Sequence, residues 1–195
     1  MNFLQLLGLE KKQHSGKHFP HEEILHLWED DYLMLELLPF DDLEFVKAET
    51  NRINGFAQEH FDGVGFTQIT PINDKPIKTI EKLIDILDVE NLLTKAGLEK
   101  VSQFHMQGVG LLQVDKALLG FGTNKFAVMC DKQNGLLKNI WVTGHTETAD
   151  EKQKLIDALL SFGQTFNFIA VNWYRSQYYN LVERNNVKEF VTNSC

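Results

Sequence analysis

The chain has 195 residues and a mass of 22.4 kDa, and 43% of its residues are apolar, so it can bury a sizeable core. Its 19 Lys and Arg against 27 Asp and Glu give a net charge of -8, which argues against a surface built to coat nucleic acid or an anionic membrane. Fourteen Phe and only four Pro exclude a disordered or collagen-like chain. We expect a single compact domain over residues 1–195, with an N-terminal helix and polar loop in 1–23 and the main body in 24–195.

No segment of the sequence predicts secretion or membrane insertion. The first residues lack the basic start and long apolar run of a cleaved signal peptide. No stretch approaches the roughly 20 apolar residues of a membrane-spanning helix. The two cysteines, Cys130 and Cys195, have neither the number of a disulfide framework nor the spacing of a zinc knuckle. We therefore expect a soluble protein of the reducing cytoplasm with no membrane partner.

The main body begins with a predicted hairpin and a long predicted helix. Two apolar runs, 24–28 and 32–38, flank a short acidic turn, and Pro39 ends the second run, a pattern typical of a β-hairpin. Apolar residues then recur at helical spacing from an N-cap at Asp42 as far as His60.

Short strands and helices are predicted to follow. After a strand at 64–72, helical periodicity covers 77–87 and 89–96. Apolar runs predict further strands at 101–106, 111–114, 126–130, 136–142 and 166–174. The dipeptide Asn134-Gly135 is a hairpin turn signal between two of them.

Two more helices complete the predicted order of elements. Residues 148–150 cap a helix that ends at Gly163, and a tail helix is expected around 176–190. Because helices and strands do not alternate strictly, this order favours the α+β class, a mainly antiparallel sheet with packed helices, over repeated βαβ units.

No local motif identifies a catalytic, metal or cofactor site. The glycines in 108–110 and 120–125 lack the further glycines of nucleotide-binding loops. Three histidines in 14–21 are of a kind that zinc accepts, but Gly16 and Pro20 weaken the helix that would align them. The sequence also lacks the nucleophile and protease signatures of known hydrolases. We predict no catalytic residues, no metal and no cofactor.

Acidic residues are concentrated in the N-terminal half of the chain. Residues 1–99 carry a net charge of -10, whereas residues 100–195 carry +2. The acids are densest in two clusters that flank one apolar segment, Glu29, Asp30 and Asp31, then Asp41, Asp42 and Glu44. A charge run is usually a solvated face. The alternative interpretation is a docking surface for a basic partner.

A second candidate contact region lies nearer the C-terminus. It contains Trp173, Tyr174, Arg175 and Tyr178, which are residue types enriched in protein-binding hot spots. Core packing explains Trp173 more simply. Because Lys and Arg are dispersed along the chain, this region is not predicted to bind nucleic acid.

Part of the sequence resembles bacterial immunity proteins, the antidotes encoded beside contact-dependent-inhibition or type VI toxins. The resemblance covers residues 24–75 and is carried by the segment LWEDDYLMLELLP at 27–39, by the acid-started helix after it, and by DGVGF at 62–66. It implies that the chain binds and neutralises a cognate toxin domain in the cytoplasm without catalysis. Because such proteins vary in fold and in contact residues, the resemblance assigns no site residue.

Under this hypothesis, the acidic clusters would present negative potential to a basic cleft, such as the active site of a nuclease toxin. Such complementarity raises the association rate, and aromatic anchors slow dissociation.

Two other classes of function stay open. A small enzyme would assemble its site from residues distant in sequence, for instance His105 or His145 with Asp115 and Asn124. A ligand-binding or regulatory module would use a pocket between the sheet and the helices. A pocket lined by acids or histidines with perturbed pKa values would favour the enzyme, an apolar cavity the module, and a flat acidic face the inhibitor.

Overall fold

The computed structural model describes residues 24–65, 67–106, 110–113 and 118–195. The N-terminal helix and polar loop predicted in 1–23, with their histidines, lie outside the described residues.

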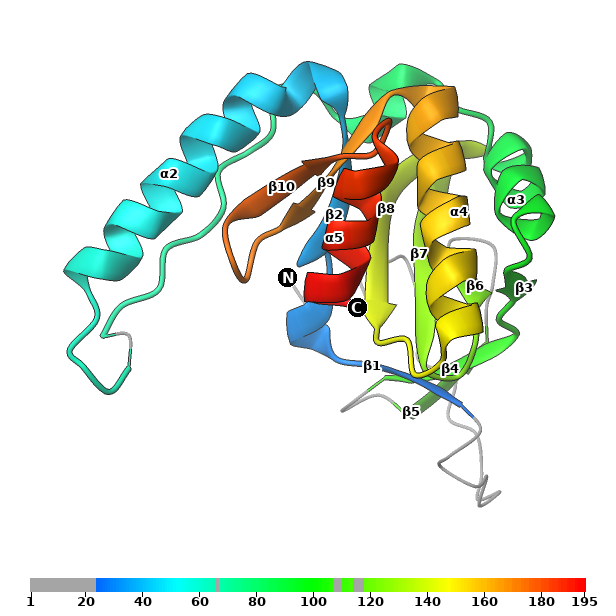
Figure 1. The fold of residues 1–195 in the computed structure, drawn as a ribbon, viewed down its shortest axis with the longest axis horizontal. Coiled ribbons are helices and arrows are strands. Elements are labelled where there is room, and N and C mark those ends of the chain that lie inside the picture. The colour runs from blue at the N-terminus through cyan, green and yellow to red at the C-terminus, as the bar shows by residue number, and fades with distance from the viewer. Residues whose placement is uncertain (1–23, 66, 107–109, 114–117) are drawn as a thin grey trace.

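A seven-stranded antiparallel sheet forms the centre of the fold (Figure 1). Its strands stand in the order β10-β9-β2-β8-β7-β6-β3. Their bounds are Gln177–Asn180 (β10), Phe168–Asn172 (β9), Leu35–Pro39 (β2), Leu136–Gly144 (β8), Phe126–Gln133 (β7), Leu118–Gly122 (β6) and Glu99–Lys100 (β3). All neighbouring strands of this sheet are antiparallel, so the predicted α+β class is confirmed.

Three helices, α3 (Ile86–Lys95), α4 (Ala149–Phe166) and α5 (Arg184–Ser194), cover one face of the sheet (Figure 1). The apolar residues buried between these helices and the sheet form the main core. Helix α4 begins at the predicted cap, where Thr148 and Glu151 each bond the backbone of the other in a capping box.

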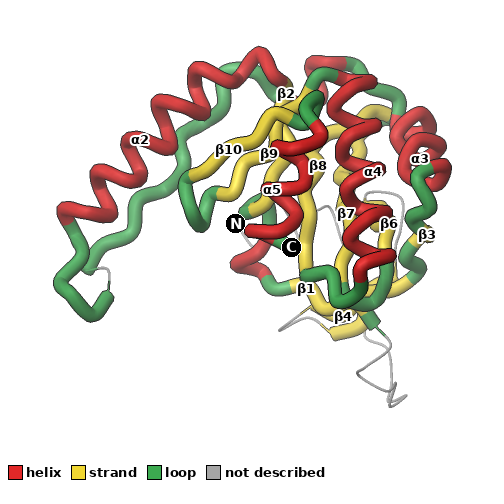
Figure 2. Tube along the Cα trace, in the orientation of Figure 1, coloured by secondary structure: helices red, strands yellow, loops and turns green. Residues whose placement is uncertain are grey.

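The other face of the sheet carries a small three-stranded sheet (Figure 2). In it, β1 (Leu25–Leu27) runs parallel to β4 (Gln103–Met106), which pairs antiparallel with β5 (Gly110–Gln113). Successive side chains of a strand point to opposite faces. Trp141 of β8 therefore packs under the small sheet, whereas its neighbour Ile140 faces the helices.

The helix α2 (Leu43–Glu59) extends away from the sheet (Figures 1 and 2). It follows the short 3-10 helix η3 (Phe40–Asp42), and its first turns pack Val46 into a third apolar cluster with β2 and β9. The chain then returns along α2. We call α2 and the described residues of 61–74 the arm.

Glu49 holds the returning segment of the arm on α2. Its side chain is buried, and it accepts hydrogen bonds from Arg52 Nε (2.9 Å) and Nη2 (2.6 Å) and from Asn73 N (2.7 Å) and Nδ2 (2.9 Å). The Arg52 guanidinium also donates to Thr70 Oγ1 and to the Pro71 carbonyl, each at 2.7 Å. The bonds from Arg52 and then Asn73 lower the pKa of Glu49 to about 2.

The hairpin predicted over 24–38 is wrong. β1 pairs with β4 in the small sheet, and β2 pairs with β9 and β8 in the large one. The 3-10 helix η2 (Glu29–Asp31) and Leu33, with a φ of 59°, redirect the chain between them. Each run has the composition of a strand, but composition does not specify the pairing partner.

Two predictions between α2 and α3 also differ from the structure. No described residue of 64–72 is in a strand, because this segment lies along α2 and not along a sheet edge. The helix predicted over 77–87 is interrupted. Its first part is the 3-10 helix η4 (Thr79–Lys82), which stops where Leu83 adopts a left-handed φ of 54°, and its last two residues belong to α3. The helix predicted over 89–96 is confirmed as part of α3.

Later in the chain, the predicted tail helix and the segment of β6 also differ from the structure. The tail helix predicted around 176–190 is the strand β10 followed by α5, with a turn at Ser176, whose φ is 50°. No strand was predicted where β6 lies. The turn at Asn134-Gly135 is confirmed, and both residues have the positive φ, 54° and 81°, that a tight hairpin needs.

Candidate functional site

A pocket of about 410 Å³ lies where the large sheet splits at one end. β2 and β8 share a single register pair, Glu36 with Trp141. β8 continues to Gly144, whereas β2 begins only at Leu35, so on the β2 side the end of β8 has no strand beside it, while β7 still pairs with its other side. Other lining residues come from β1, η2, the β6–β7 turn, the segment after β9 and the end of α5.

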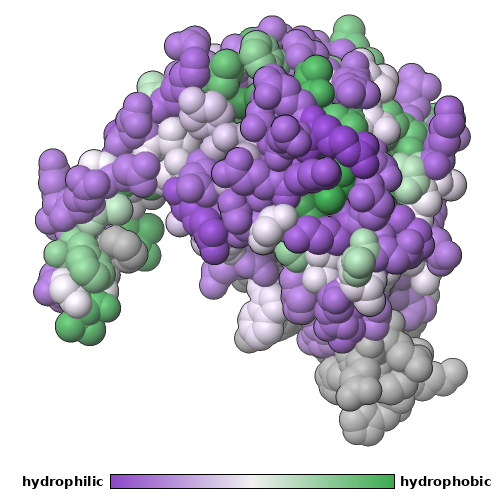
Figure 3. Space-filling view, in the orientation of Figure 1, coloured by the Kyte–Doolittle hydropathy of each residue, from purple (hydrophilic) through white to green (hydrophobic). Residues whose placement is uncertain are grey.

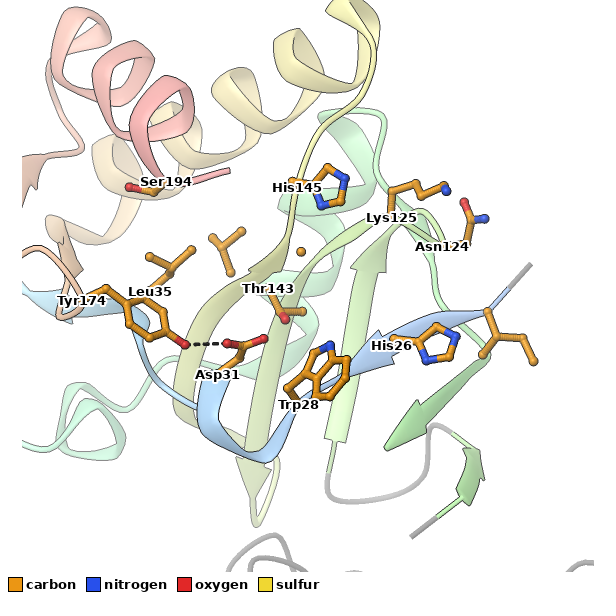
Figure 4. Close-up of a pocket in the computed structure, with 13 residues that line it drawn as sticks. His26, Trp28, Asp31, Leu35, Asn124, Lys125, Thr143, His145, Tyr174 and Ser194 are labelled. Atoms are coloured by element: carbon orange, nitrogen blue, oxygen red, sulfur yellow. Dashed lines mark hydrogen bonds between the residues drawn. The ribbon is translucent and has the colours of Figure 1, made fainter. Parts of the chain in front are cut away.

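Asp31 and Tyr174 form one side of the pocket (Figure 4). The Tyr174 hydroxyl donates to Asp31 Oδ1 and lies 3.2 Å from the Asp30 carbonyl oxygen. Partial burial and the Asp31 carboxylate raise the pKa of Tyr174, so the phenol stays protonated at neutral pH. The structure thus joins the acidic cluster at 29–31 to the aromatic segment near the C-terminus.

Basic and amide groups form the other side of the pocket. Lys125 and Asn124 come from the β6–β7 turn, and His145 follows β8. Lys125 Nζ lies 3.3 Å and His145 Nε2 3.6 Å from Glu147 Oε1. Gly144, with a φ of 77°, brings the end of β8 against the turn, since a Cβ there would lie 2.0 Å from the Lys125 carbonyl oxygen.

Thr143 lies between these two sides. Its side chain is 2% exposed, and among the described residues its Oγ1 has no hydrogen-bond partner. A buried hydroxyl without a partner costs roughly 1–3 kcal/mol. Trp28, half exposed, and the buried Leu35 and Val142 supply the apolar lining.

The acidic residues singled out in the sequence fall into two groups. Glu29, Asp30 and Asp31 lie before β2, whereas Asp41, Asp42 and Glu44 lie after it. Five residues of strand at about 3.3 Å each separate the groups by roughly 16 Å.

Local contacts occupy the acids of the second group. Asp41 Oδ2 lies 2.6 Å from Lys82 Nζ, and Glu44 Oε1 lies 2.7 Å from Lys47 Nζ. Asp42 is buried at the N-cap position of α2 but makes no capping bond. Its Oδ1 accepts from Ile77 N at 3.2 Å, and burial raises its pKa. Asp30, in the first group, is exposed.

The aromatic residues singled out in the sequence also separate. Trp173 is 4% exposed, and its Nε1 donates to the buried Glu36 at 3.3 Å, so it is a core residue. Tyr174, Arg175 and Tyr178 are exposed. Only Tyr174 among them lines the pocket.

The residues named for an enzyme come together in part. His145 and Asn124 both line the pocket, but His105 lies in the small sheet against His26, with 5.0 Å between ring centroids and the two rings tilted by 48°. Asp115 lies outside the described residues. In the described part of the chain, no three or more His, Cys, Asp or Glu side chains are placed to hold a metal ion.

The pocket contains residues that the sequence analysis missed, chiefly Thr143, Trp28 and Lys125. Thr143 sits in an apolar strand and has no sequence signal of its own. Asn124 and Lys125 stand between the glycine-containing segment 120–122 and the next strand. This position in the sequence indicates only a turn.

No helix among the described residues combines the length and apolar character needed to cross a membrane. Comparison of the chain with protein-family models, with curated proteins and with solved structures finds no match. The residues and their geometry alone therefore carry a conclusion on function.

Proposed function

We propose that the chain is an immunity protein that binds and neutralises a cognate toxin domain with a basic surface, such as a nuclease, and performs no catalysis itself. The observation that carries this proposal is the arm, which ends in exposed apolar side chains. At its tip Val64 is 96% exposed, Ile69 93% and Phe61 52%. Figure 3 shows hydrophobic side chains gathered at this end of the molecule.

Exposed apolar residues gathered at one place mark interaction sites, whereas single ones need no explanation. The packing of α2 explains why these residues are not buried by the chain itself. Only its first turns pack against the sheet, and its buried residues, Val46, Glu49 and Thr50, stop before Gly55. The outer half of the arm is therefore available to a partner.

The charge of the arm indicates the kind of partner. Residues 53–74 contain Glu59, Asp62 and Asp74 but no Lys or Arg. Arg52, at the inner end of this stretch, is paired with Glu49. An apolar tip with acidic residues beside it complements an apolar cleft rimmed by basic residues. Such complementarity speeds association and selects the partner.

The arm is also held in shape before a partner arrives. The bonds of Glu49 and Arg52 tie the returning segment to α2. A surface that is already ordered loses less conformational entropy on binding, so more of the contact energy appears as affinity.

Asp30, Asp31, Tyr174 and Arg175 form a second candidate contact surface for the same toxin. They lie near one another through the hydrogen bond of Tyr174 to Asp31. Asp41, Asp42, Glu44 and Tyr178 stay predictions as contact residues, with Asp42 buried.

The test expresses the full chain with the C-terminal domain of the large protein encoded beside it and measures complex formation and protection of cells. The double variant Val64→Asp, Ile69→Asp places two charges in the apolar contact. Hot-spot losses of about 2 kcal/mol correspond to roughly 30-fold weaker binding. Leu87→Asp is the matched control, because Leu87 is also exposed but lies on α3.

Unchanged affinity in the double variant would remove the arm as the contact surface. Comparison of Asp30→Lys with Asp41→Lys, at opposite ends of β2, then identifies which acidic group the toxin contacts. Absence of both capture and protection with the neighbouring toxin domain would overturn the proposed function itself.

A further inference from the structure

We propose that β10, the edge strand of the large sheet on the side of the arm, pairs with an extended basic segment of the toxin domain, which adds a strand to the sheet. This inference rests on the proposed function, because its partner is the same toxin domain. It assigns a contact made by the backbone, which neither the apolar tip of the arm nor the acidic residues supply.

The two edges of the large sheet differ in their protection against another strand. At one edge, β3 has only two residues, Glu99 and Lys100, and both are charged and exposed. Short and charged edge strands discourage pairing with a further chain. At the other edge, β10 (Gln177–Asn180) has no charged residue, no proline and no bulge in its register with β9. It therefore lacks these forms of protection.

The hydrogen bonds around β10 identify the backbone groups that point away from the sheet. Leu181 N donates to the Phe168 carbonyl oxygen at 3.3 Å. In an antiparallel pair, residues that bond the neighbouring strand alternate with residues that do not. Tyr179 therefore bonds β9, whereas the N–H and C=O of Tyr178 and the N–H of Asn180 point to the open edge.

These outward groups are available to a partner. Among the described residues, the N–H and C=O of Tyr178 have no hydrogen-bond partner, and the residue is 40% exposed. The Asn180 carbonyl is occupied by Glu183 N at 3.2 Å, but its N–H is open. A row of unpaired groups on a sheet edge is a template for one more strand. Addition of an extended segment to such an edge is a recurring mode of protein recognition.

β10 lies between the two contact surfaces proposed for the toxin. It follows Tyr174 and Arg175 directly in the chain, and it contacts α2. In Figure 1, β10 is the margin of the sheet that faces the arm, and Figure 3 shows the outline of the molecule hollowed between the arm tip and the body. A strand added to β10 therefore joins the arm and the second surface into one continuous contact.

The charge around this edge favours a basic segment over a second copy of the chain. The arm residues 53–74 include three acidic residues and no Lys or Arg, and Lys47 of α2 is paired with Glu44 at 2.7 Å. Arg175, in the turn before β10, is offset by the acidic pair at 30–31, which Tyr174 contacts. Two copies, each with a net charge of -8, would repel each other, whereas a basic segment is attracted.

Hydrogen exchange followed by NMR on the full chain tests the pairing amide by amide. In the free chain, the amides of Tyr178 and Asn180 should exchange quickly, and that of Tyr179 slowly because it bonds β9. When the toxin domain encoded beside the chain is bound, exchange at Tyr178 should slow by about 10-fold or more, while Tyr179 stays protected. A contact made through side chains alone would not produce this alternation.

Two variants at one position separate the backbone from the side chain. Tyr178→Pro removes the outward N–H but no bond to β9, and proline is tolerated at such positions of edge strands. Tyr178→Ala is the matched control, because it removes the same side chain and keeps the N–H. We expect Tyr178→Pro to bind the toxin domain about 10-fold more weakly than Tyr178→Ala, since the backbone bonds of one residue are lost. Similar melting temperatures of the two variants would show that β10 still pairs with β9.

The inference is overturned if the Tyr178 amide is already protected in the free chain, if its exchange is unchanged in the complex, or if the two folded variants bind equally. Protection of Tyr178 that rises with the concentration of the chain alone would assign the edge to a second copy, which also overturns it. In each of these cases the natural chain still captures the toxin domain, so the proposed function stands. Absence of any capture would overturn both.

Discussion

Glu49 is the residue on which the shape of the arm depends most. Its four hydrogen bonds from Arg52 and Asn73 lower its pKa from 4.5 to about 2. A shift of this size corresponds to about 3 kcal/mol in favour of the carboxylate in the folded arm. Because Arg52 is 37% exposed and solvent screens the pair, we expect Glu49→Gln to destabilise the arm by about 2 kcal/mol.

The expected pH dependence has a definite sign. The folded pKa of Glu49 lies below its unfolded value, so its contribution is fully present above pH 4.5 and is lost as the pH falls toward 2. Arm stability in the natural chain should fall across this window, while the Glu49→Gln variant should lack this component of the change.

Hydrogen exchange measures this effect directly. The amides of residues 53–60 and of Asn73 report opening of the arm, and amides of β7 and β8 report global unfolding. Glu44→Gln is the matched control on the same helix, because Glu44 is 84% exposed and solvent screens its pair with Lys47. Equal protection of the arm in the two variants, or the same acid profile in both Glu49 forms, would refute the reasoning.

Other features of the fold give simpler predictions. Gly163→Ala should destabilise the protein by roughly 2 kcal/mol despite the higher helix propensity of alanine, because its Cβ would lie 2.5 Å from the Leu181 backbone. Gly55→Ala, with nothing within 4 Å, should stabilise α2 by about 0.5–1 kcal/mol, and urea unfolding compares the two. Thr148→Ala should cost about 1 kcal/mol through loss of the α4 cap, visible as a lower melting temperature. Cys130 is fully buried, and burial raises its pKa, so it should react with a thiol reagent only after unfolding.

Local sequence signals predicted the helices and turns whose formation depends on interactions between residues close together in the chain. The polar cap at Thr148 and the apolar spacing after it predict α4, and the same periodicity predicts α2. Asn134 and Gly135 tolerate the positive φ of a tight turn, which is why they predict the β7–β8 hairpin. The sequence signals for these elements lie within each element or in the residues next to it.

Pairing between distant segments was not predictable in this way. The apolar runs that contain β1 and β2 look like one hairpin, yet they enter different sheets. β10 was predicted as helix, but it completes the sheet because β9 offers it an antiparallel edge across the turn at Ser176. The energy of a sheet comes from cross-strand contacts, which a single segment does not reveal.

The candidate pocket depends even more on distant segments. Asp31 and Tyr174, 143 positions apart in the chain, share a hydrogen bond. The sequence marked both residues, but for partner contact and in separate patches. Nothing in the sequence marked Thr143, because the tertiary structure around a buried hydroxyl decides whether it has a hydrogen-bond partner.

By itself, the sequence determined the α+β class, the main helices and the central hairpin, because capping, turn conformation and periodicity act over short distances. Only the tertiary structure decided which strands pair, where the arm projects and which polar groups meet at the split between β2 and β8. Those outcomes follow from burial and hydrogen bonding between segments far apart in the chain, whose free energy exists only once the segments are brought together.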